Sequence, residues 1–234
     1  MRILRIIPLM AMVSLLSGCD LRVLNPASDT ADTLSNLIYL SFILMMLVFA
    51  VVIILFTRFV LKYRQTKENK DYIPAEKKES KLYETLWTVL PILLLVVLAV
   101  PTVKATYDLT YKSAAGEGFK RDAVQVDVQA KQFSWTFTYE NGKKSQNELV
   151  LPVDQKAAFT LTSKDVVHSF WVPRLGGKID CIPGKTTHMA LVPEKIGTYQ
   201  GKCAEFCGAS HAYMRFKTRV VSRETFEKWL NTKE

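Results

Sequence analysis

The chain has 234 residues, of which 49% are hydrophobic, and a formal net charge of +9. This length leaves room for one compact domain together with membrane segments, and four cysteines are too few for a disulfide-rich scaffold. The sequence contains no nucleotide-binding glycine loop, no Ser-His-Asp arrangement and no Cys-x-x-Cys-His motif. We therefore expect no haem bound by this chain itself.

Residues 1–18 fit a secretory signal. Arg2 and Arg5 precede an apolar run, and Leu16-Ser-Gly-Cys19 resembles a bacterial lipobox. We expect cleavage before Cys19, lipidation of that cysteine, and an outer segment over residues 19–32. The alternative is an uncleaved membrane anchor, but the apolar run is short for a span.

Two uncharged apolar segments follow, residues 33–57 and 85–103, with 25 and 19 residues. Each can cross a hydrocarbon core of about 30 Å as a helix that rises about 1.5 Å per residue. We predict a transmembrane hairpin over residues 33–103 with a loop at 58–84. Residues 58–81 hold eight basic side chains against four acidic ones, which marks the cytoplasmic side. Pro91 and Pro101 in the second span imply a partner whose helices satisfy the freed backbone groups.

From residue 104 to 234, short segments with alternating apolar and polar residues replace the apolar runs. Residues 124–128, 133–139, 158–162 and 188–192 fit strands, and Asn141-Gly142 fits a hairpin turn. We predict a β-sandwich or Greek-key barrel. A short helix with Ser222 as its N-cap and Glu224 in its first turn should close the chain.

Two cysteines, a histidine and a methionine fall within twelve positions near the end of the chain: Cys203, Cys207, His211 and Met214. Such soft ligands suit copper or zinc and do not suit magnesium or calcium. Their spacing would point all four side chains to one side of a tight loop or a helical turn. His168, in an apolar run that reads as a strand, is the candidate for a further ligand.

Two alternatives stay open for these residues. The cysteines could form a disulfide, or two cysteines and two histidines could hold a structural zinc ion. Met214 favours copper, because zinc seldom binds a thioether, whereas a weak axial methionine is typical of copper electron-transfer sites.

The spacing resembles the dinuclear CuA site of subunit II of haem-copper cytochrome oxidases, and the resemblance covers about residues 30–230. The matching residues are His168, Cys203, Glu205, Cys207, His211 and Met214. The resemblance implies a cupredoxin-like domain in which both thiolates bridge two copper ions. Residues that match His168 and Met214 then complete one ion, and those that match His211 and the carbonyl of Glu205 complete the other.

The same resemblance implies further cofactors and partners. The Glu205 side chain should help to hold a magnesium ion shared with subunit I, and haem should be found only in that partner. Glu84-Thr-Leu-Trp87 opens the second span, where a carboxylate suits the helix N-terminus and Trp87 suits the membrane interface. It also resembles the family's second helix, whose glutamate lies near the entrance of a proton pathway. Phe170, Trp171 and Phe206 could form an apolar shell around the copper ions.

The electron donor is the point at which the sequence departs from the family. The family usually has Gln-Trp-aromatic-Trp for electron input from cytochrome c, whereas this chain has Gln132-Phe133-Ser134-Trp135. Residues 104–234 contain 20 Lys and Arg against 14 Asp and Glu, a net charge of about +6. An acidic or membrane-tethered donor fits this charge better than a basic cytochrome c, unless a local acidic patch forms around Asp127, Glu140 or Glu148. Cys181 is left over and is expected to be a small buried residue.

The sequence therefore predicts the electron-input subunit of a respiratory terminal oxidase. It would be catalytic only within a complex with subunit I, with a cytochrome c-type donor and coupled proton translocation. We expect it in the inner membrane of a bacterium, with the C-terminal domain on the periplasmic or extracellular face. The alternatives are the CuA subunit of a related nitric oxide reductase and a membrane-tethered copper-delivery protein. Quinol oxidation at this subunit is disfavoured, because related quinol-oxidase subunits lack the copper ligands present here.

Overall fold

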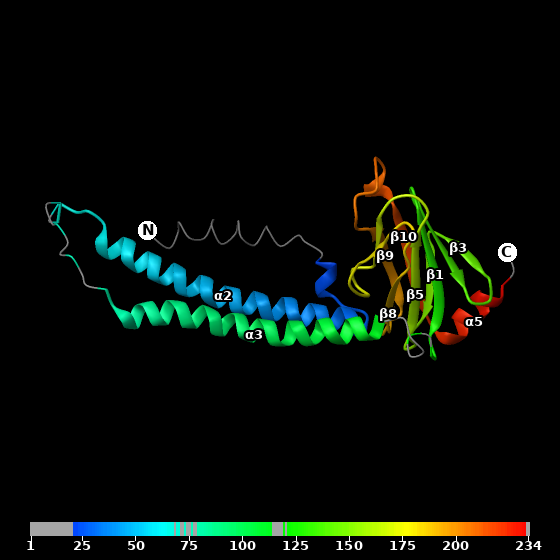
Figure 1. Ribbon diagram of the computed structural model, residues 1–234, viewed down its shortest axis with the longest axis horizontal. Coiled ribbons are helices and arrows are strands. Elements are labelled where there is room, and N and C mark those ends of the chain that lie inside the picture. The colour runs from blue at the N-terminus through cyan, green and yellow to red at the C-terminus, as the bar shows by residue number, and fades with distance from the viewer. Residues whose placement is uncertain are drawn as a thin grey trace, which may run out of the picture.

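The computed structural model describes residues 21–67, 69–70, 73, 76, 79–113, 119 and 121–232. The predicted signal peptide and the lipidation site at Cys19 lie outside these residues. Two long helices run side by side away from a β-sandwich, which gives the molecule an elongated shape (Figure 1). The membrane hairpin and the β-domain are thus distinct parts of one chain.

The hairpin consists of α2 (Asp29–Tyr63) and α3 (Lys81–Ser113). Both helices are long and apolar enough to cross a membrane. Each extends beyond the uncharged segment predicted from the sequence, so the loop predicted at 58–84 is helical at both of its ends. At about 1.5 Å per residue, α2 is roughly 50 Å long and exceeds the hydrocarbon core of about 30 Å. The helix is therefore longer than a perpendicular span needs, and its excess length is taken up by tilt or by turns outside the hydrocarbon core.

The sandwich has two five-stranded sheets, in the orders β3-β2-β1-β5-β8 and β4-β10-β9-β6-β7. Most neighbours are antiparallel, but β1 pairs with β5, and β4 with β10, in parallel. Parallel neighbours cannot be joined by a tight hairpin and require longer crossover connections. The strands are β1 (Val124–Lys131), β2 (Ser134–Tyr139), β3 (Lys144–Gln146), β4 (Glu148–Pro152), β5 (Ala157–Ser163), β6 (His168–Trp171), β7 (Ile179–Cys181), β8 (Thr187–Leu191), β9 (Gly197–Cys203) and β10 (Arg215–Val221).

Aromatic side chains fill the space between the sheets. Trp135 and Phe137 of β2 are fully buried, and Phe170 of β6 stacks on Phe216 of β10 with ring centroids 5.0 Å apart. In β9 and β10 buried and exposed residues alternate, which is the period that places one face of a strand in the core. The alternating patterns predicted β1, β2, β5 and β8, although β2 begins one residue later than predicted, because residues 131–134 form the turn after β1.

The closing helix, α5 (Arg223–Asn231), confirms the prediction made from its cap. Ser222 Oγ accepts a hydrogen bond from the Thr225 backbone N–H at 3.3 Å. Phe226 and Trp229 pack against Tyr139, with ring centroids 6.1 and 5.0 Å away. This helix covers the end of the sandwich away from the cysteine loop (Figure 1).

The segment before α2 packs onto the sandwich. After the short helix η2 (Arg22–Leu24), the Ala27 backbone N–H donates to the Arg174 carbonyl at 2.8 Å, and the Ala27 carbonyl accepts from Glu194 N–H at 2.9 Å. Asp29 Oδ1 accepts from the Val192 N–H at 2.9 Å, and Ala27 is fully buried in the main core. Residues 27–29, within the outer segment predicted at 19–32, therefore contact the β-domain directly.

Candidate metal centre

The candidate ligands come from three places at one end of the sandwich. His168 is the first residue of β6, Cys203 is the last residue of β9, and the loop from β9 to β10 carries the rest. The Cys203 backbone N–H donates to the Met214 carbonyl at 2.9 Å, which closes the neck of this loop. The loop itself projects from the sandwich (orange in Figure 1). Two paired strands thus hold its ends rigidly.

The two thiols are at the centre of the cluster. Cys203 Sγ lies 3.8 Å from Cys207 Sγ, 3.8 Å from His168 Nδ1 and 3.2 Å from the Glu205 carbonyl oxygen. Cys207 Sγ lies 3.6 Å from His211 Nδ1 and 3.7 Å from Met214 Sδ. Each sulfur therefore contacts one imidazole and one weaker donor. The sulfurs are well beyond the disulfide bond length of about 2.05 Å, and both cysteines are free.

The spacing of these atoms fits ligands of first-row metal ions. Two ligand atoms each about 2.0 to 2.3 Å from a tetrahedral ion lie roughly 3.3 to 3.8 Å apart. The ligand atoms of His168, Cys203 and Cys207 all lie within 4.8 Å of one another and are buried. The donor set, with two thiols, two imidazoles, a thioether and a carbonyl, exceeds the four ligands of a structural zinc site. It fits two soft metal ions bridged by sulfur.

Asp165 and Gln132 surround the ligands with hydrogen bonds that sequence analysis did not find. Asp165 Oδ1 lies 2.8 Å from His168 Nε2, and Asp165 Oδ2 accepts from the Gln132 backbone N–H at 2.7 Å. Gln132 Nε2 donates to the Cys207 carbonyl at 2.6 Å. A carboxylate three residues before a ligand histidine is a signal that could have identified Asp165, because such partners fix the orientation of metal-binding imidazoles.

Burial and hydrogen bonding shift the acidities around the cluster. Burial alone would raise the pKa of Asp165, but hydrogen bonds from the Gln132 N–H, the His168 ring and the Val166 N–H outweigh it and lower the pKa to about 2. Burial and the neighbouring Cys203 raise the pKa of Cys207 to about 12. Without metal this thiol is protonated at neutral pH, so metal binding must release its proton.

The remaining predicted residues lie around the cluster. Trp135 is fully buried, with its ring centroid 6.2 Å from that of His168, whereas Phe133 is partly exposed. Glu84 lies in the first turn of α3, at the far end of the hairpin. Cys181 is buried as expected, and burial followed by the proximity of Cys203 raises its pKa to about 12.

The expectation of an aromatic shell is only partly confirmed. Phe170 is buried and Trp171 is half-buried, but Phe206 is 77% exposed. Phe206 lies on the projecting loop, where no other part of the described chain covers it. Glu205 is also partly exposed, and its Oε2 lies 4.0 Å from Lys178 Nζ.

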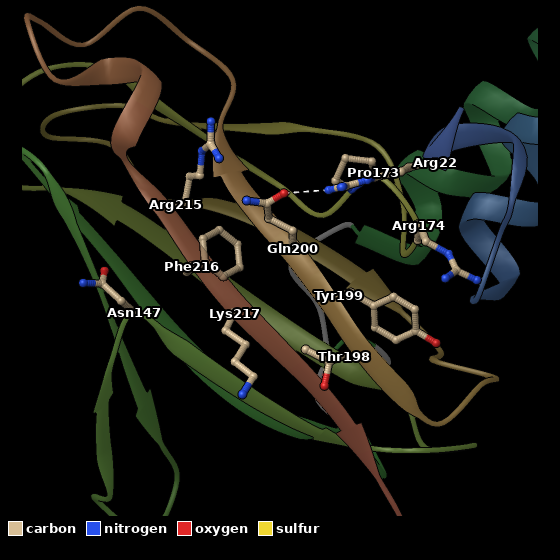
Figure 2. A pocket seen from close by; sticks show the side chains of 10 residues that line it. All are labelled: Arg22, Asn147, Pro173, Arg174, Thr198, Tyr199, Gln200, Arg215, Phe216 and Lys217. Atoms are coloured by element: carbon tan, nitrogen blue, oxygen red, sulfur yellow. Dashed lines mark hydrogen bonds between the residues drawn. The ribbon is translucent and has the colours of Figure 1, made fainter. Parts of the chain in front are cut away.

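A basic groove of about 620 Å³ runs over β9 and β10 beside the cluster (Figure 2). Its cations are Arg22, Arg174, Arg215 and Lys217, and no described acidic residue lines it. Arg22 Nη1 donates to Gln200 Oε1 at 2.6 Å, which ties the N-terminal segment to β9. A second pocket shares Arg22 and Arg215 and reaches Cys203 and His211, so the groove adjoins the metal ligands.

Comparison with known proteins gives the family. Residues 19–105 match the family described as cytochrome c oxidase subunit II, transmembrane domain, and residues 140–221 match its periplasmic domain. The chain is 41% identical over 231 residues to cytochrome c oxidase subunit 2 of Alkalihalophilus pseudofirmus, which covers 97% of this chain and 67% of that protein. The chain belongs to the cytochrome c oxidase subunit II family. It is therefore a membrane protein and a subunit of a haem-copper terminal oxidase.

Some relatives of this chain are named as subunits of quinol oxidases, whose electron donor is a quinol. Quinol oxidase subunit 2 of Bacillus cereus is 35% identical over 224 residues, covering 94% of this chain and 76% of that protein. Among solved structures, the periplasmic domain of cytochrome oxidase subunit II from Bradyrhizobium japonicum is 31% identical, with a TM-score of 0.45, and covers 47% of this chain and 92% of that one. The family alone therefore does not determine the electron donor of this subunit II.

Proposed function

We propose that this subunit II accepts electrons from a cytochrome c-type donor through a dinuclear CuA centre and passes them to haem in subunit I for oxygen reduction. The observation that supports the proposal is the arrangement of two thiols 3.8 Å apart with four further donor groups around them. A copper pair bound there supplies one-electron transfer in which the change of charge is spread over two ions. The two sheets fix the ligands, so little has to rearrange when an electron arrives.

The residues of the cluster divide into proposed copper ligands and a residue that orients one of them. Cys203 and Cys207, with His168, Met214, His211 and the Glu205 carbonyl, would hold the copper pair. Asp165 holds the His168 ring in place through Nε2 and leaves Nδ1 free to bind metal.

The outer residues connect the chain to its complex. The Glu205 side chain is exposed enough to share a magnesium ion with subunit I, and Glu84 lies near the entrance of a proton pathway. Trp135 and Phe133 are assigned to electron input, with Phe133 nearer to the surface.

The chain is placed in the inner membrane of a bacterium. A signal over residues 1–18 leads to a lipid on Cys19, and the domain over residues 104–234 faces the periplasm or the exterior. The basic loop between the spans supports this orientation. Intact-mass measurement of the mature chain tests the proposed cleavage and the lipid on Cys19, because an unmodified Met1 at the N-terminus would exclude lipidation.

Three other functions remain distinguishable. A nitric oxide reductase would share the CuA ligands but contain a different haem partner. A quinol oxidase subunit would not need the ligands found here, and a copper-delivery protein would not need Glu84 in a membrane hairpin. Purification with the native partners and identification of their haems separates these functions.

The decisive experiment is metal analysis of the purified complex. We expect two copper ions per subunit II and the electron paramagnetic resonance signal of a mixed-valence pair. Cys207→Ser should remove this signal, because one bridging thiolate is lost. One zinc ion per subunit, or a Cys203–Cys207 disulfide in the native enzyme, would rule out the proposal.

A further inference from the structure

We propose that the copper end of the β-domain docks an acidic electron-carrier domain, an inference that rests on the proposed function and names its donor. The surface consists of an apolar contact patch, Phe133, Val166 and Val167, and a basic collar around the ligands, Lys131, Lys164, Lys202 and Arg215.

Three loops form one continuous surface over the ligands. The turn at 131–134 is joined to the loop at 164–167 by the bond from Gln132 N–H to Asp165, and to the cysteine loop by the bond from Gln132 to the Cys207 carbonyl. Phe133 also lies against Gly208, since a Cβ added to that glycine would be 3.3 Å from the Phe133 ring. A partner that touches this surface therefore comes close to the copper ligands.

The contact patch is apolar although it is open to solvent. Phe133, Val166 and Val167 are 37, 38 and 36% exposed, on two loops that touch. Electron-transfer partners commonly meet through small surfaces, and an apolar centre lets water leave the contact. Phe133 is next to Gln132, which bonds to Cys207, so the patch offers a short route to the site.

The basic collar surrounds this end of the domain. Lys131 and Lys164 immediately precede Gln132 and Asp165, while Lys202 and Arg215 are next to Cys203 and Met214. All four collar side chains are exposed, and none forms an ion pair within the described part of the chain. Lys202 and Arg215 also stand directly opposite each other across β9 and β10. Like charges in that position repel, and an acidic partner would relieve the repulsion.

The acidic residues near the site are already engaged. Asp165 accepts hydrogen bonds from His168 and Gln132, and Glu205 lies 4.0 Å from Lys178. The basic groove adds Arg22, Arg174 and Lys217 on the side of β9 and β10 (Figure 2). The field at the copper end is therefore positive.

The three acids that could have formed a local acidic patch lie elsewhere. Glu140 follows β2 at the end of the sandwich opposite the 131–134 turn, and Glu148 is paired with Arg219 at 3.3 Å. Asp127 lies within β1, opposite Thr138 and Thr160. None of the three is part of the copper-end loops, so they do not form an acidic patch there for a basic donor.

The partner that fits is a haem-carrying domain with an apolar cofactor edge inside a ring of carboxylates. We would compare the oxidation of a reduced acidic cytochrome c and of a reduced basic mitochondrial cytochrome c by the purified oxidase complex, following copper reduction by stopped flow. The wild-type complex should react faster with the acidic protein at low salt. Its rate should fall as salt is added, because the Debye length shrinks to about 10 Å at 0.1 M.

Charge-reversal variants test whether the lysines of the basic collar bind the donor. Lys131→Glu/Lys164→Glu should slow the acidic donor by about tenfold at low salt and accelerate the basic one, with both rates returning toward wild type at high salt. The control, Lys144→Glu/Arg223→Glu, makes the same charge change at the opposite end and should alter either rate by less than about twofold. Lys131→Gln/Lys164→Gln gives a smaller change of the same sign and serves if the double Glu variant fails to assemble.

Copper spectra separate this inference from the proposed function. Two results would overturn the docking inference while an intact CuA signal leaves the proposed function standing. In the first, the wild-type complex reacts faster with the basic cytochrome. In the second, the test and control variants change the rates equally. Absence of the copper signal from the wild-type complex would overturn both.

Discussion

At the scale of single residues, the His168 ring has different partners on its two nitrogens. Nδ1 faces the Cys203 sulfur at 3.8 Å, and Nε2 faces the Asp165 carboxylate at 2.8 Å. The carboxylate makes the imidazole a stronger electron donor and adds negative charge near the metal. Both effects favour the oxidised form of a copper centre.

Asp165→Asn should therefore raise the reduction potential of the copper centre. We expect a shift of roughly 30 to 60 mV, which is up to about tenfold in the one-electron equilibrium. Spectroelectrochemical titration of the purified complex measures it. Asp127→Asn removes the same charge from the middle of β1 and should leave the potential nearly unchanged; an equal shift in both variants would mean that the contact with His168 has no special role.

Met214 offers a second test at this scale. It is fully buried, with Sδ 3.7 Å from Cys207 Sγ, and leucine has nearly the same volume. Met214→Leu should thus retain both copper ions but shift their potential, because a weak axial ligand tunes a copper site more than it holds it. Metal analysis and potentiometry on the same sample decide the matter, and loss of copper would show that the thioether is essential for binding.

At the scale of elements, β9 and β10 must pack tightly to hold the ends of the cysteine loop. Gly201 of β9 faces Phe216 of β10 so closely that an added Cβ would overlap the ring. Phe216 in turn stacks on Phe170 of β6, two residues after His168. The absence of a side chain at position 201 lets the aromatic core approach the strand that ends in Cys203.

Gly201→Ala should destabilise the domain by about 1 to 3 kcal/mol, as overpacked cores do. The displaced Phe216 ring would also disturb the neck of the loop, so copper occupancy should fall. Thermal unfolding and copper content of the purified complex report the two effects. Thr198→Ala, at an exposed position of the same strand, is the control, and equal stability of the two variants would contradict the packing argument.

The sequence predicted those elements whose signal is local. Alternating apolar and polar residues predicted β1, β2, β5 and β8, and Ser222 predicted the start of α5. The spacing of the cysteines and of His211 identified ligands that the fold brings together. The strands β3, β4, β7, β9 and β10 were not predicted; β3 and β7 have only three residues each, which carry too little periodicity. The contact between Gln132 and Cys207 spans 75 positions, and no local pattern encodes it.

At the scale of the whole molecule, the metal cluster lies on a domain whose position is fixed by the base of the membrane hairpin. Ser28 caps α2 by accepting from the Ala31 N–H at 3.1 Å, and its hydroxyl also donates to the Leu175 carbonyl. The helix start and the loop after β6 are thus held by one side chain. This connection holds the β-domain against the base of the two-helix hairpin.

The same connection predicts that the β-domain is weakened when it is separated from the N-terminal segment. Hydrogen bonds from residues 27–29 to Arg174, Val192 and Glu194 are lost in a fragment of residues 104–232, together with the burial of Ala27. At about 1 kcal/mol for each bond, we expect a loss of about 2 to 4 kcal/mol and a melting temperature lower by roughly 10 °C.

Adding a peptide of residues 21–32 to this fragment should restore part of the stability in a concentration-dependent way, because a ligand that binds only the folded state stabilises it. The same peptide with Ala27→Glu is the control, since a carboxylate cannot enter the apolar site of Ala27 without a large cost. Differential scanning calorimetry measures both. If the unmodified peptide does not change the melting temperature of the fragment, residues 27–29 contact the β-domain but do not stabilise it.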